Sequence, residues 1–443
     1  MEPSLIIGSD YLLLLVYWVL FYFILKFAKS FYPDNFLIQK YLIPGFFAKI
    51  SGAIFFALLV FYYYGFGDTL SYFRDTMILR QILAENKISF LEIYTSDYEF
   101  MRDRFDLMGS VTESGFMVTK IALLLTYLSF SRFLITTFLM ANVIYLGVFK
   151  LFQTFVYLAP TWHRFIAWIV LFFPSLAIYG SGIFKEPVCF SAMGWIIFCG
   201  YKIFIEKRIS LFYVTLGIFS IFLITVVKSY IIAAFLIPLC VLVVMHFSNK
   251  IKSPVLRVIS LPLSVLILIA LYAAFAGKID ESLGIFAVDK LSENVQGLND
   301  QYNKMSAEDA GSNFEIGAIE PTLAGLIKKI PVGFVATLFR PFLWETRNVV
   351  MLFSTLESLS ILLFNLFVIK KAGLFSFIKI LFTNPVILFF ITYSIIFSGF
   401  VGISSLNFGT LARYRVPVIP FYLMGLLLIY AKTFVVDIKP ETN

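Results

Sequence analysis

The stretch YLLLLVYWVLFYFILKF, residues 11–27, decides the class of fold. It is almost wholly apolar, and Lys26 is its single charged residue. A helix needs about 20 such residues to cross a hydrocarbon core of about 30 Å. The run is also longer than the roughly 7–15 apolar residues of a cleavable signal peptide, so we expect a retained first span. Comparable runs recur along the rest of the chain.

The composition of the whole chain agrees with this first stretch. Of 443 residues, 60% are hydrophobic and 14% are charged, and the mean hydropathy is +0.90. An average soluble domain has about 25% charged residues, so ordinary soluble folds are excluded. We therefore expect an all-α fold, a polytopic transmembrane helical bundle of about 11–12 helices that forms one integral membrane domain over residues 1–443.

The apolar runs define the predicted spans and two polar interruptions. The candidate spans are Tyr11–Phe27, Ile50–Gly65, Gly115–Phe130, Phe133–Phe149, Phe165–Ser181, Val188–Ile205, Leu211–Val227, Tyr230–His246, Val255–Ala276, Val350–Ile369, Pro385–Val401 and Val416–Ala431. Residues 66–114 and 277–349 are predicted to be the first and second external loops. Twelve full crossings cannot place both on one side, so we expect eleven crossings and a re-entrant or interfacial helix near Gly115.

The charges predict the orientation. The net charge of +8 comes largely from Lys and Arg in short connections, among them those holding Lys40, Lys49 and Lys370. Such connections are typically cytoplasmic, so the two polar segments should be periplasmic and no nucleic-acid partner is expected. His163 and His246 then lie on the cytoplasmic side. No metal-ligand spacing or nucleotide-binding motif is present, and we predict neither metal nor cofactor.

Five polar clusters then fall on the non-cytoplasmic face. They lie at residues 67–75, 180–187, 228–230, 338–348 and 407–417. Ionisable side chains at membrane depth cost several kcal/mol unless they pair or line a wet cavity, so they mark functional sites by default. Arg340, Arg413 and Arg415 are the most informative, because Arg suits bidentate recognition of phosphate or carboxylate. A lipid pyrophosphate combines such an anionic head with a hydrocarbon tail.

Structural readings of the same residues stay open. Arg340 could pair with Glu345 or with acidic residues of the long loops, and Lys185 with Glu186 across a tight turn. Lys228 could simply mark a turn between two apolar runs. Asp68 could cap a helix instead of serving as a general base.

A resemblance to a known family rests on the order of these motifs. An early Gly67-Asp68 motif precedes Ser181-Gly182-Ile183-Phe184-Lys185-Glu186, and Phe339-Arg340-Pro341-Phe342-Leu343-Trp344-Glu345 and Arg413-Tyr414-Arg415-Val416-Pro417 follow a late polar segment. This arrangement resembles the Wzy-type O-antigen and exopolysaccharide polymerases and their EpsG-like relatives. The resemblance covers nearly the whole chain in architecture.

The resemblance implies a metal-independent membrane glycosyltransferase of the bacterial inner membrane. It would polymerise undecaprenyl-pyrophosphate-linked oligosaccharide repeats of a surface polysaccharide on the periplasmic face, with a chain-length regulator and a flippase as further partners. Glu345, Asp68 or Glu186, in that order, would take the acceptor proton. The residues expected to bind substrate are Arg340, Arg413, Arg415, Lys185, Arg74, Arg347, Lys228 and Tyr414. The absence of a periplasmic histidine argues against the related ligases.

Two other functions are compatible with the sequence. A GT-C-type glycosyltransferase that uses a polyprenyl-phosphate sugar carries an acidic residue in its first external loop, which Asp68 or Asp75 could supply. A transporter or flippase of lipid-linked glycans belongs to a different class. It would be expected to show polar groups near the middle of its spans and an internal repeat, and no repeat is evident.

Overall fold

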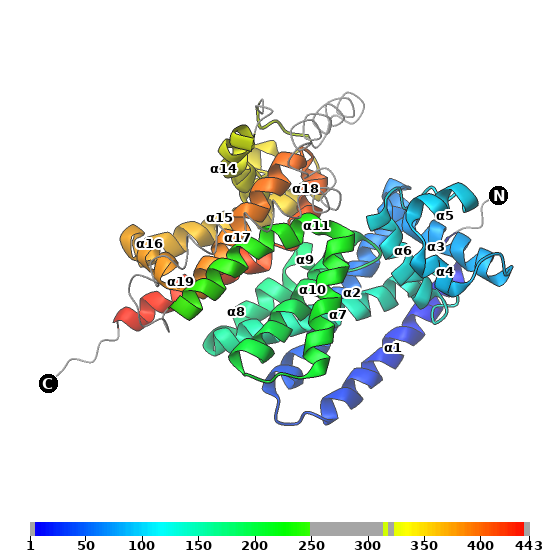
Figure 1. The fold of residues 1–443 in the computed structure, drawn as a ribbon, viewed down its shortest axis with the longest axis horizontal. Coiled ribbons are helices and arrows are strands. Elements are labelled where there is room, and N and C mark those ends of the chain that lie inside the picture. The colour runs from blue at the N-terminus through cyan, green and yellow to red at the C-terminus, as the bar shows by residue number, and fades with distance from the viewer. Residues whose placement is uncertain (1–4, 249–312, 318–322, 438–443) are drawn as a thin grey trace. The chain divides into compact units, whose positions relative to one another are not determined.

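A computed structural model describes residues 5–248, 313–317 and 323–437 of the protein. Helices dominate this part of the chain, and the only bridge between extended residues that it contains pairs Asn313 with Asn407 (Figure 1). The prediction of an all-α protein is therefore confirmed. The chain divides into two compact units, residues 1–228 and 229–443. Each is described by itself.

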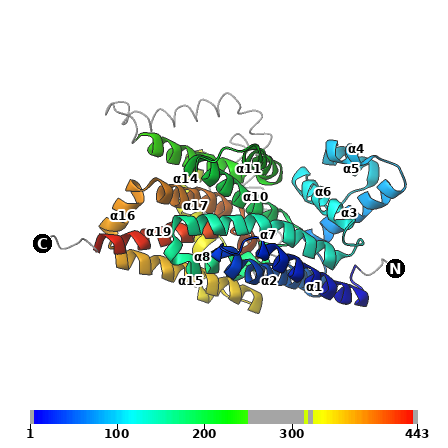
Figure 2. The same cartoon turned by 90° about the horizontal axis from the view of Figure 1, so that it is seen from below.

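Unit 1 is built around α7 (Phe133–Leu158), which is buried along most of its length. It packs against α2 (Phe36–Leu59) and α10 (Lys185–Gly200), and α1 (Gly8–Ser30) lies beside α2 and α7 (Figure 2). The other elements are η1 (Val60–Tyr64), α3 (Asp68–Ala84), α4 (Phe90–Thr95), α5 (Tyr98–Phe105), α6 (Glu113–Thr126), η2 (Pro160–Trp162), α8 (His163–Ala167), η3 (Trp168–Phe172), α9 (Pro174–Ile178), η4 (Tyr201–Ile205) and the first part of α11 (Leu211–Ser248). At Gly147 a Cβ would lie 2.2 Å from the Ser191 carbonyl oxygen, so only glycine permits this approach of α7 to α10.

Unit 2 is built around a second close helix pair. Here α14 (Leu323–Phe339) packs against α17 (Pro385–Ser404), and a Cβ on Gly402 would lie 2.1 Å from the Gly333 carbonyl oxygen. The remaining elements are η6 (Leu343–Glu345), α15 (Val349–Ala372), α16 (Leu374–Thr383), α18 (Phe408–Tyr414) and α19 (Ile419–Asp437). Both α15 and α17 contact α19, which completes the core of the unit.

The described residues include seven helices long and apolar enough to cross a membrane, or eight if one bent pair counts as a span. The seven are Gly8–Ser30, Phe36–Tyr64, Phe133–Leu158, Lys185–Ile205, Leu211–Met245, Val349–Ala372 and Pro385–Ser404, and the pair is Phe408–Tyr414 with Ile419–Thr433. Apolar helices satisfy every backbone polar group internally, which is what a bilayer requires. These helices support the predicted multi-pass membrane protein.

The difference from the predicted eleven crossings has local reasons. Two candidate spans merge into α11, which continues through a kink at Lys228. The candidate Phe165–Ser181 is divided into three short helices, with extended backbone at Phe173 before Pro174. The helix near Gly115 is α6, whose 14 residues fall short of the length of a span. The candidate Val255–Ala276 lies outside the described residues.

The two predicted loops contain helices. Residues 66–114 hold α3, α4 and α5, which pack their apolar faces together with α6 around Leu79, Ile93 and Met101. Of residues 277–349, those at 277–312 and 318–322 lie outside the described residues. The remainder includes α14, an apolar helix that the sequence interpretation had treated as part of a loop.

Lys49 occupies a position that the charge pattern did not predict. It was expected in a cytoplasmic connection, but it lies within α2 and is fully buried. Its ammonium group donates to the Leu176 carbonyl oxygen at 2.5 Å and lies 4.9 Å from the centre of the Phe190 ring. The broken backbone at α9 supplies this acceptor. The assignment of Lys49 to a basic connection was therefore wrong.

Candidate functional site

The first part of the candidate site is the turn that follows α14. The Nε atom of Arg340 donates to Glu345 Oε1 at 3.0 Å and Oε2 at 3.1 Å, and its Nη2 atom also contacts Glu345. The guanidinium lies 4.5 Å from the ring centre of Phe314 and 5.3 Å from that of Phe408. The predicted alternative for Arg340, pairing with Glu345, is what the structure contains.

The Glu345 carboxylate also closes its own turn. The backbone N–H of Phe342 donates to Glu345 Oε2 at 2.8 Å. Burial favours a higher pKa for Glu345, but the hydrogen bonds from Arg340 and Phe342 and the charges of Arg340 and Arg347 outweigh burial, and the net pKa is lowered. Glu345 is thus an ionised acceptor in this arrangement, and it would become more basic if Arg340 moved away.

The second part of the candidate site is Arg415, which is 1% exposed. Its Nη1 atom donates to Ser358 Oγ at 2.6 Å, and its Nη2 atom donates to Ser354 Oγ at 3.1 Å and to Glu357 Oε2 at 3.0 Å. All three partners project from the first half of α15, which is long and apolar enough to span a membrane. The guanidinium is therefore held by a carboxylate and hydroxyl groups within an apolar helix.

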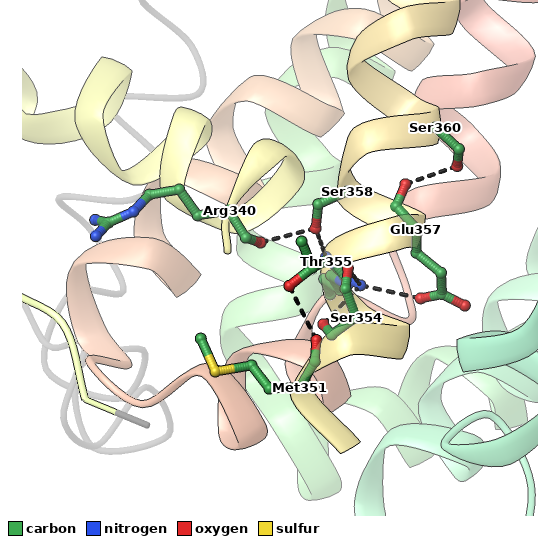
Figure 3. Close-up of polar contacts among 8 residues, drawn as sticks. Arg340, Met351, Ser354, Thr355, Glu357, Ser358 and Ser360 are labelled. Atoms are coloured by element: carbon green, nitrogen blue, oxygen red, sulfur yellow. Dashed lines mark hydrogen bonds and ion pairs between the residues drawn. The ribbon is translucent and has the colours of Figure 1, made fainter. Parts of the chain in front are cut away.

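Ser358 joins the two parts. Its hydroxyl donates to the Arg340 carbonyl oxygen at 2.8 Å (Figure 3). The same hydroxyl accepts from Arg415. The side chain of Arg340 extends away from Ser358, whereas its carbonyl oxygen points toward it (Figure 3). The Arg340 backbone and the Arg415 guanidinium, from distant parts of the sequence, are thus fixed to one residue of α15. We call Arg340, Glu345, Ser354, Glu357, Ser358 and Arg415 the arginine network.

The local sequence explains why Arg415 can reach α15. Asn407 begins α18, and its side chain accepts from the backbone N–H of Gly409 at 2.9 Å and of Thr410 at 3.1 Å. Arg415 ends α18, and α19 begins at Ile419 after a bend of 64°. A continuous helix would not leave the Arg415 side chain at such a corner.

The other residues predicted in unit 2 lie around this network. The Arg413 guanidinium is 5.4 Å from the ring centre of Tyr414, and both side chains are partly exposed. Arg347 is exposed and follows η6, where its charge contributes to the lowered pKa of Glu345. These three residues share the unit of the arginine network and are more accessible than Arg415.

Three of the predicted residues belong to another site, in unit 1. Lys228 Nζ lies 2.6 Å from Glu186 Oε1, and both side chains are buried. Lys228 has φ −152° and ψ 78°, so the helix α11 breaks at the residue that forms the ion pair. Lys185 donates to Thr112 Oγ1 at 3.2 Å. The ion pair links the first turn of α10 to the kink of α11.

Asp68 and Arg74 lie on α3, also in unit 1. Asp68 is the first residue of that helix, where the helix dipole stabilises a negative charge. Arg74 is exposed. The neighbouring Asp75 is buried and accepts from the backbone N–H groups of Gly109 at 2.9 Å and Ser110 at 2.6 Å. The carboxylates ranked as possible bases are thus divided between the units, with Glu345 alone in unit 2.

Glu357, Ser354 and Ser358 were missed in the sequence interpretation. Glu357 is the only acidic residue of the candidate span Val350–Ile369. A lone carboxylate in such a run is itself a signal of a functional or paired group. The two serines give no comparable signal, because single hydroxyl groups are common in apolar helices.

No family model, curated protein or solved structure matches this chain. Its function is therefore inferred from its own residues.

Proposed function

We propose that the protein is a glycosyltransferase of the bacterial inner membrane. It polymerises undecaprenyl-pyrophosphate-linked oligosaccharide repeat units of a surface polysaccharide on the periplasmic face. One observation carries the proposal: Ser358, on a helix long and apolar enough to span a membrane, bonds both the Arg415 guanidinium and the backbone carbonyl oxygen of Arg340. A ligand with an anionic head and a hydrocarbon tail fits guanidinium groups that lie beside such a helix.

The accessible part of this arrangement would receive the pyrophosphate. The Arg340 and Arg413 side chains are partly exposed and Arg347 is exposed, whereas Arg415 is buried. In the proposed reaction Arg340, Arg413 and Arg347 bind the pyrophosphate oxygens. Arg415 keeps its bonds to α15 and holds the turn in place through Ser358. The arginines stabilise the charge that develops on the leaving pyrophosphate.

The Arg340–Glu345 pair provides a way to couple binding to proton transfer. In the reaction the acceptor hydroxyl oxygen forms a bond to the anomeric carbon, and the bond from that carbon to the pyrophosphate oxygen breaks. The acceptor proton passes to the Glu345 carboxylate. When Arg340 turns toward the pyrophosphate, Glu345 loses the Arg340 hydrogen bonds that help to lower its pKa and becomes a stronger base.

A second candidate function is favoured by one specific observation. The bend of 64° between α18 and α19 places a discontinuous pair next to Arg415, and Glu357 lies inside an apolar helix. Transporters often bind substrates at such interrupted helices. A transporter or flippase of lipid-linked glycans would also use these residues, but it would form no glycosidic bond.

Deletion of the gene followed by gel analysis of surface polysaccharide tests the proposal. The expected product is a single repeat in place of long chains. Unchanged chain length would contradict polymerisation. Purified protein in liposomes distinguishes the polymerase from the transporter. Flux of lipid-linked glycan without any new glycosidic bond would establish transport.

Variants of the arginine network test the assigned roles in the reconstituted reaction. Arg340→Ala should lower the turnover by about 10²–10³-fold, as removal of a charge-stabilising donor does in other enzymes. Arg102→Ala is the matched control, since Arg102 is exposed and paired with Asp103. If Asp68→Ala abolished transfer of a single sugar while Arg340→Ala had little effect, the GT-C-type alternative would be favoured instead.

A further inference from the structure

The helix α16 presents an exposed apolar face with no protein cover among the described residues. Leu374, Phe375, Ile378 and Phe382 are all exposed, and Phe375 is 91% exposed. At 100° per residue these four side chains occupy one sector of the helix. A large aromatic side chain this exposed needs an apolar surrounding, which water does not provide.

The other two sectors of α16 differ in kind. Phe377, Ile380 and Leu381 are partly buried, and α16 packs against α15, α17 and α19. Ser376, Lys379 and Thr383 form a polar sector between the packed side and the exposed apolar side. The helix thus has one side for protein, one for hydrocarbon and one for a polar medium.

The length of α16 decides how it can meet a membrane. Its 10 residues extend about 15 Å at 1.5 Å per residue, which is half of a hydrocarbon core of about 30 Å. It follows α15 after the single residue Gly373, whose φ of +71° allows the sharp turn. A short helix with adjacent apolar and polar sectors lies in the interface between hydrocarbon and headgroups.

The charged residues of α16 and of the adjoining end of α15 are all positive. Lys370 and Lys371 end α15, and Lys379 is on α16; all three are exposed, and none forms an ion pair within the described part of the chain. The sequence contains no Asp or Glu between Glu357 and Asp437. Cationic side chains beside an interfacial apolar face are complementary to anionic headgroups.

From this geometry we infer that α16 is an interfacial helix that binds anionic phospholipids of the surrounding leaflet. Leu374, Phe375, Ile378 and Phe382 contact the acyl chains. Lys370, Lys371 and Lys379 contact the phosphate groups. The site is distinct in position from the arginine network and does not depend on the proposed function.

Native mass spectrometry of the full-length protein tests this inference. The protein is titrated with phosphatidylglycerol or with phosphatidylcholine of the same acyl chains, and bound lipids are counted. The parent protein should retain phosphatidylglycerol at lower lipid concentration. Replacement of Lys370, Lys371 and Lys379 by Gln should weaken that binding by about tenfold or more, since each cation near a headgroup contributes separately.

Two further sets of variants keep the result interpretable. Replacement of the same three lysines by Arg keeps the charge and should retain binding. Replacement of Lys87, Arg102 and Arg104 by Gln removes the same charge from residues that are each paired with a carboxylate, and should leave binding unchanged. The single variant Lys379→Gln serves if the triple variant does not fold, and it should lower binding measurably.

Three results would overturn the inference. One is equal retention of the two lipids by the parent protein. Another is undiminished phosphatidylglycerol binding in the folded Gln variants of α16, and a third is an equal loss in the control variant. If Phe375→Ser instead converted a dimer to a monomer without changing lipid binding, the apolar face would be an interface between copies of the chain.

Discussion

Separating Arg415 from Glu357 should reveal a strong coupling between them. The Arg415 guanidinium is 1% exposed, and its Nη2 atom lies 3.0 Å from Glu357 Oε2. Replacing Glu357 by Gln removes the carboxylate that contacts Arg415 Nη2, while it keeps the shape of the side chain and one acceptor oxygen. Replacing Arg415 by Met leaves the carboxylate without its guanidinium.

The expected magnitude follows from burial and from the bonds that survive. Removing one member of a buried ion pair costs about 3–5 kcal/mol in soluble proteins. In Glu357→Gln the bonds of Arg415 to Ser354 and Ser358 remain, so we expect a cost at or just below the lower limit of that range, about 2–3 kcal/mol. Arg415→Met should cost about 3–5 kcal/mol, because it also removes the hydrogen bonds to both serines.

The double variant provides the decisive comparison. Once Glu357 is neutral, Arg415→Met should cost less than in the parent, giving a coupling energy of at least about 1.5 kcal/mol. The free energy of unfolding is measured on the full-length protein in detergent, by titration with a denaturing detergent and helicity as the signal. Glu99→Gln is the control, since Glu99 is exposed on α5, and it should change stability by about 0.5 kcal/mol at most. Costs that add to within about 0.5 kcal/mol would refute the reasoning that the two charges depend on each other.

Three more predictions concern the other carboxylates. Because the pKa of Glu345 is lowered from 4.5 in the folded protein, its stabilising contribution is complete above pH 4.5 and is lost as pH falls through the lower folded pKa. In melting curves recorded at acidic pH, the Glu345→Gln variant should therefore lose less stability than the parent. The same pH dependence in variant and parent would contradict this prediction. Glu186→Gln should lower the melting temperature by leaving the buried Lys228 ammonium without its carboxylate, and Glu186→Gln combined with Lys228→Met should recover part of the loss. A double variant no more stable than the single variant would show that the ion pair is unimportant. Asp75→Asn should speed amide hydrogen exchange at Ser110 and lower the free energy of unfolding by about 1.5–3 kcal/mol, since hydrogen bonds to a charged acceptor are lost. Exchange at Ser110 as slow as in the parent would show that the Asp75 carboxylate does not stabilise this loop.

The class of fold could be predicted from the sequence because it depends on composition and on the length of each apolar run, which are properties of local sequence. Long helices such as α7 and α17 coincide with predicted spans, since a helix that buries its backbone in hydrocarbon needs only its own residues. Within the described residues, two interruptions of the predicted spans depend on neighbouring helices. The break at Phe173 is accompanied by a bond from Lys49, and the kink in α11 is accompanied by the Lys228–Glu186 ion pair.

The sequence by itself determined that Arg340 and Arg415 need an explanation, because cations beside apolar helices are costly in a membrane. It also offered Glu345 as the partner of Arg340, five residues away along the chain. Only the tertiary structure decided that Arg415 pairs with Glu357 and that Ser358 joins both arginines. The physical reason is that periodicity within one helix shows which residues share a face. It does not show which other helix that face will meet.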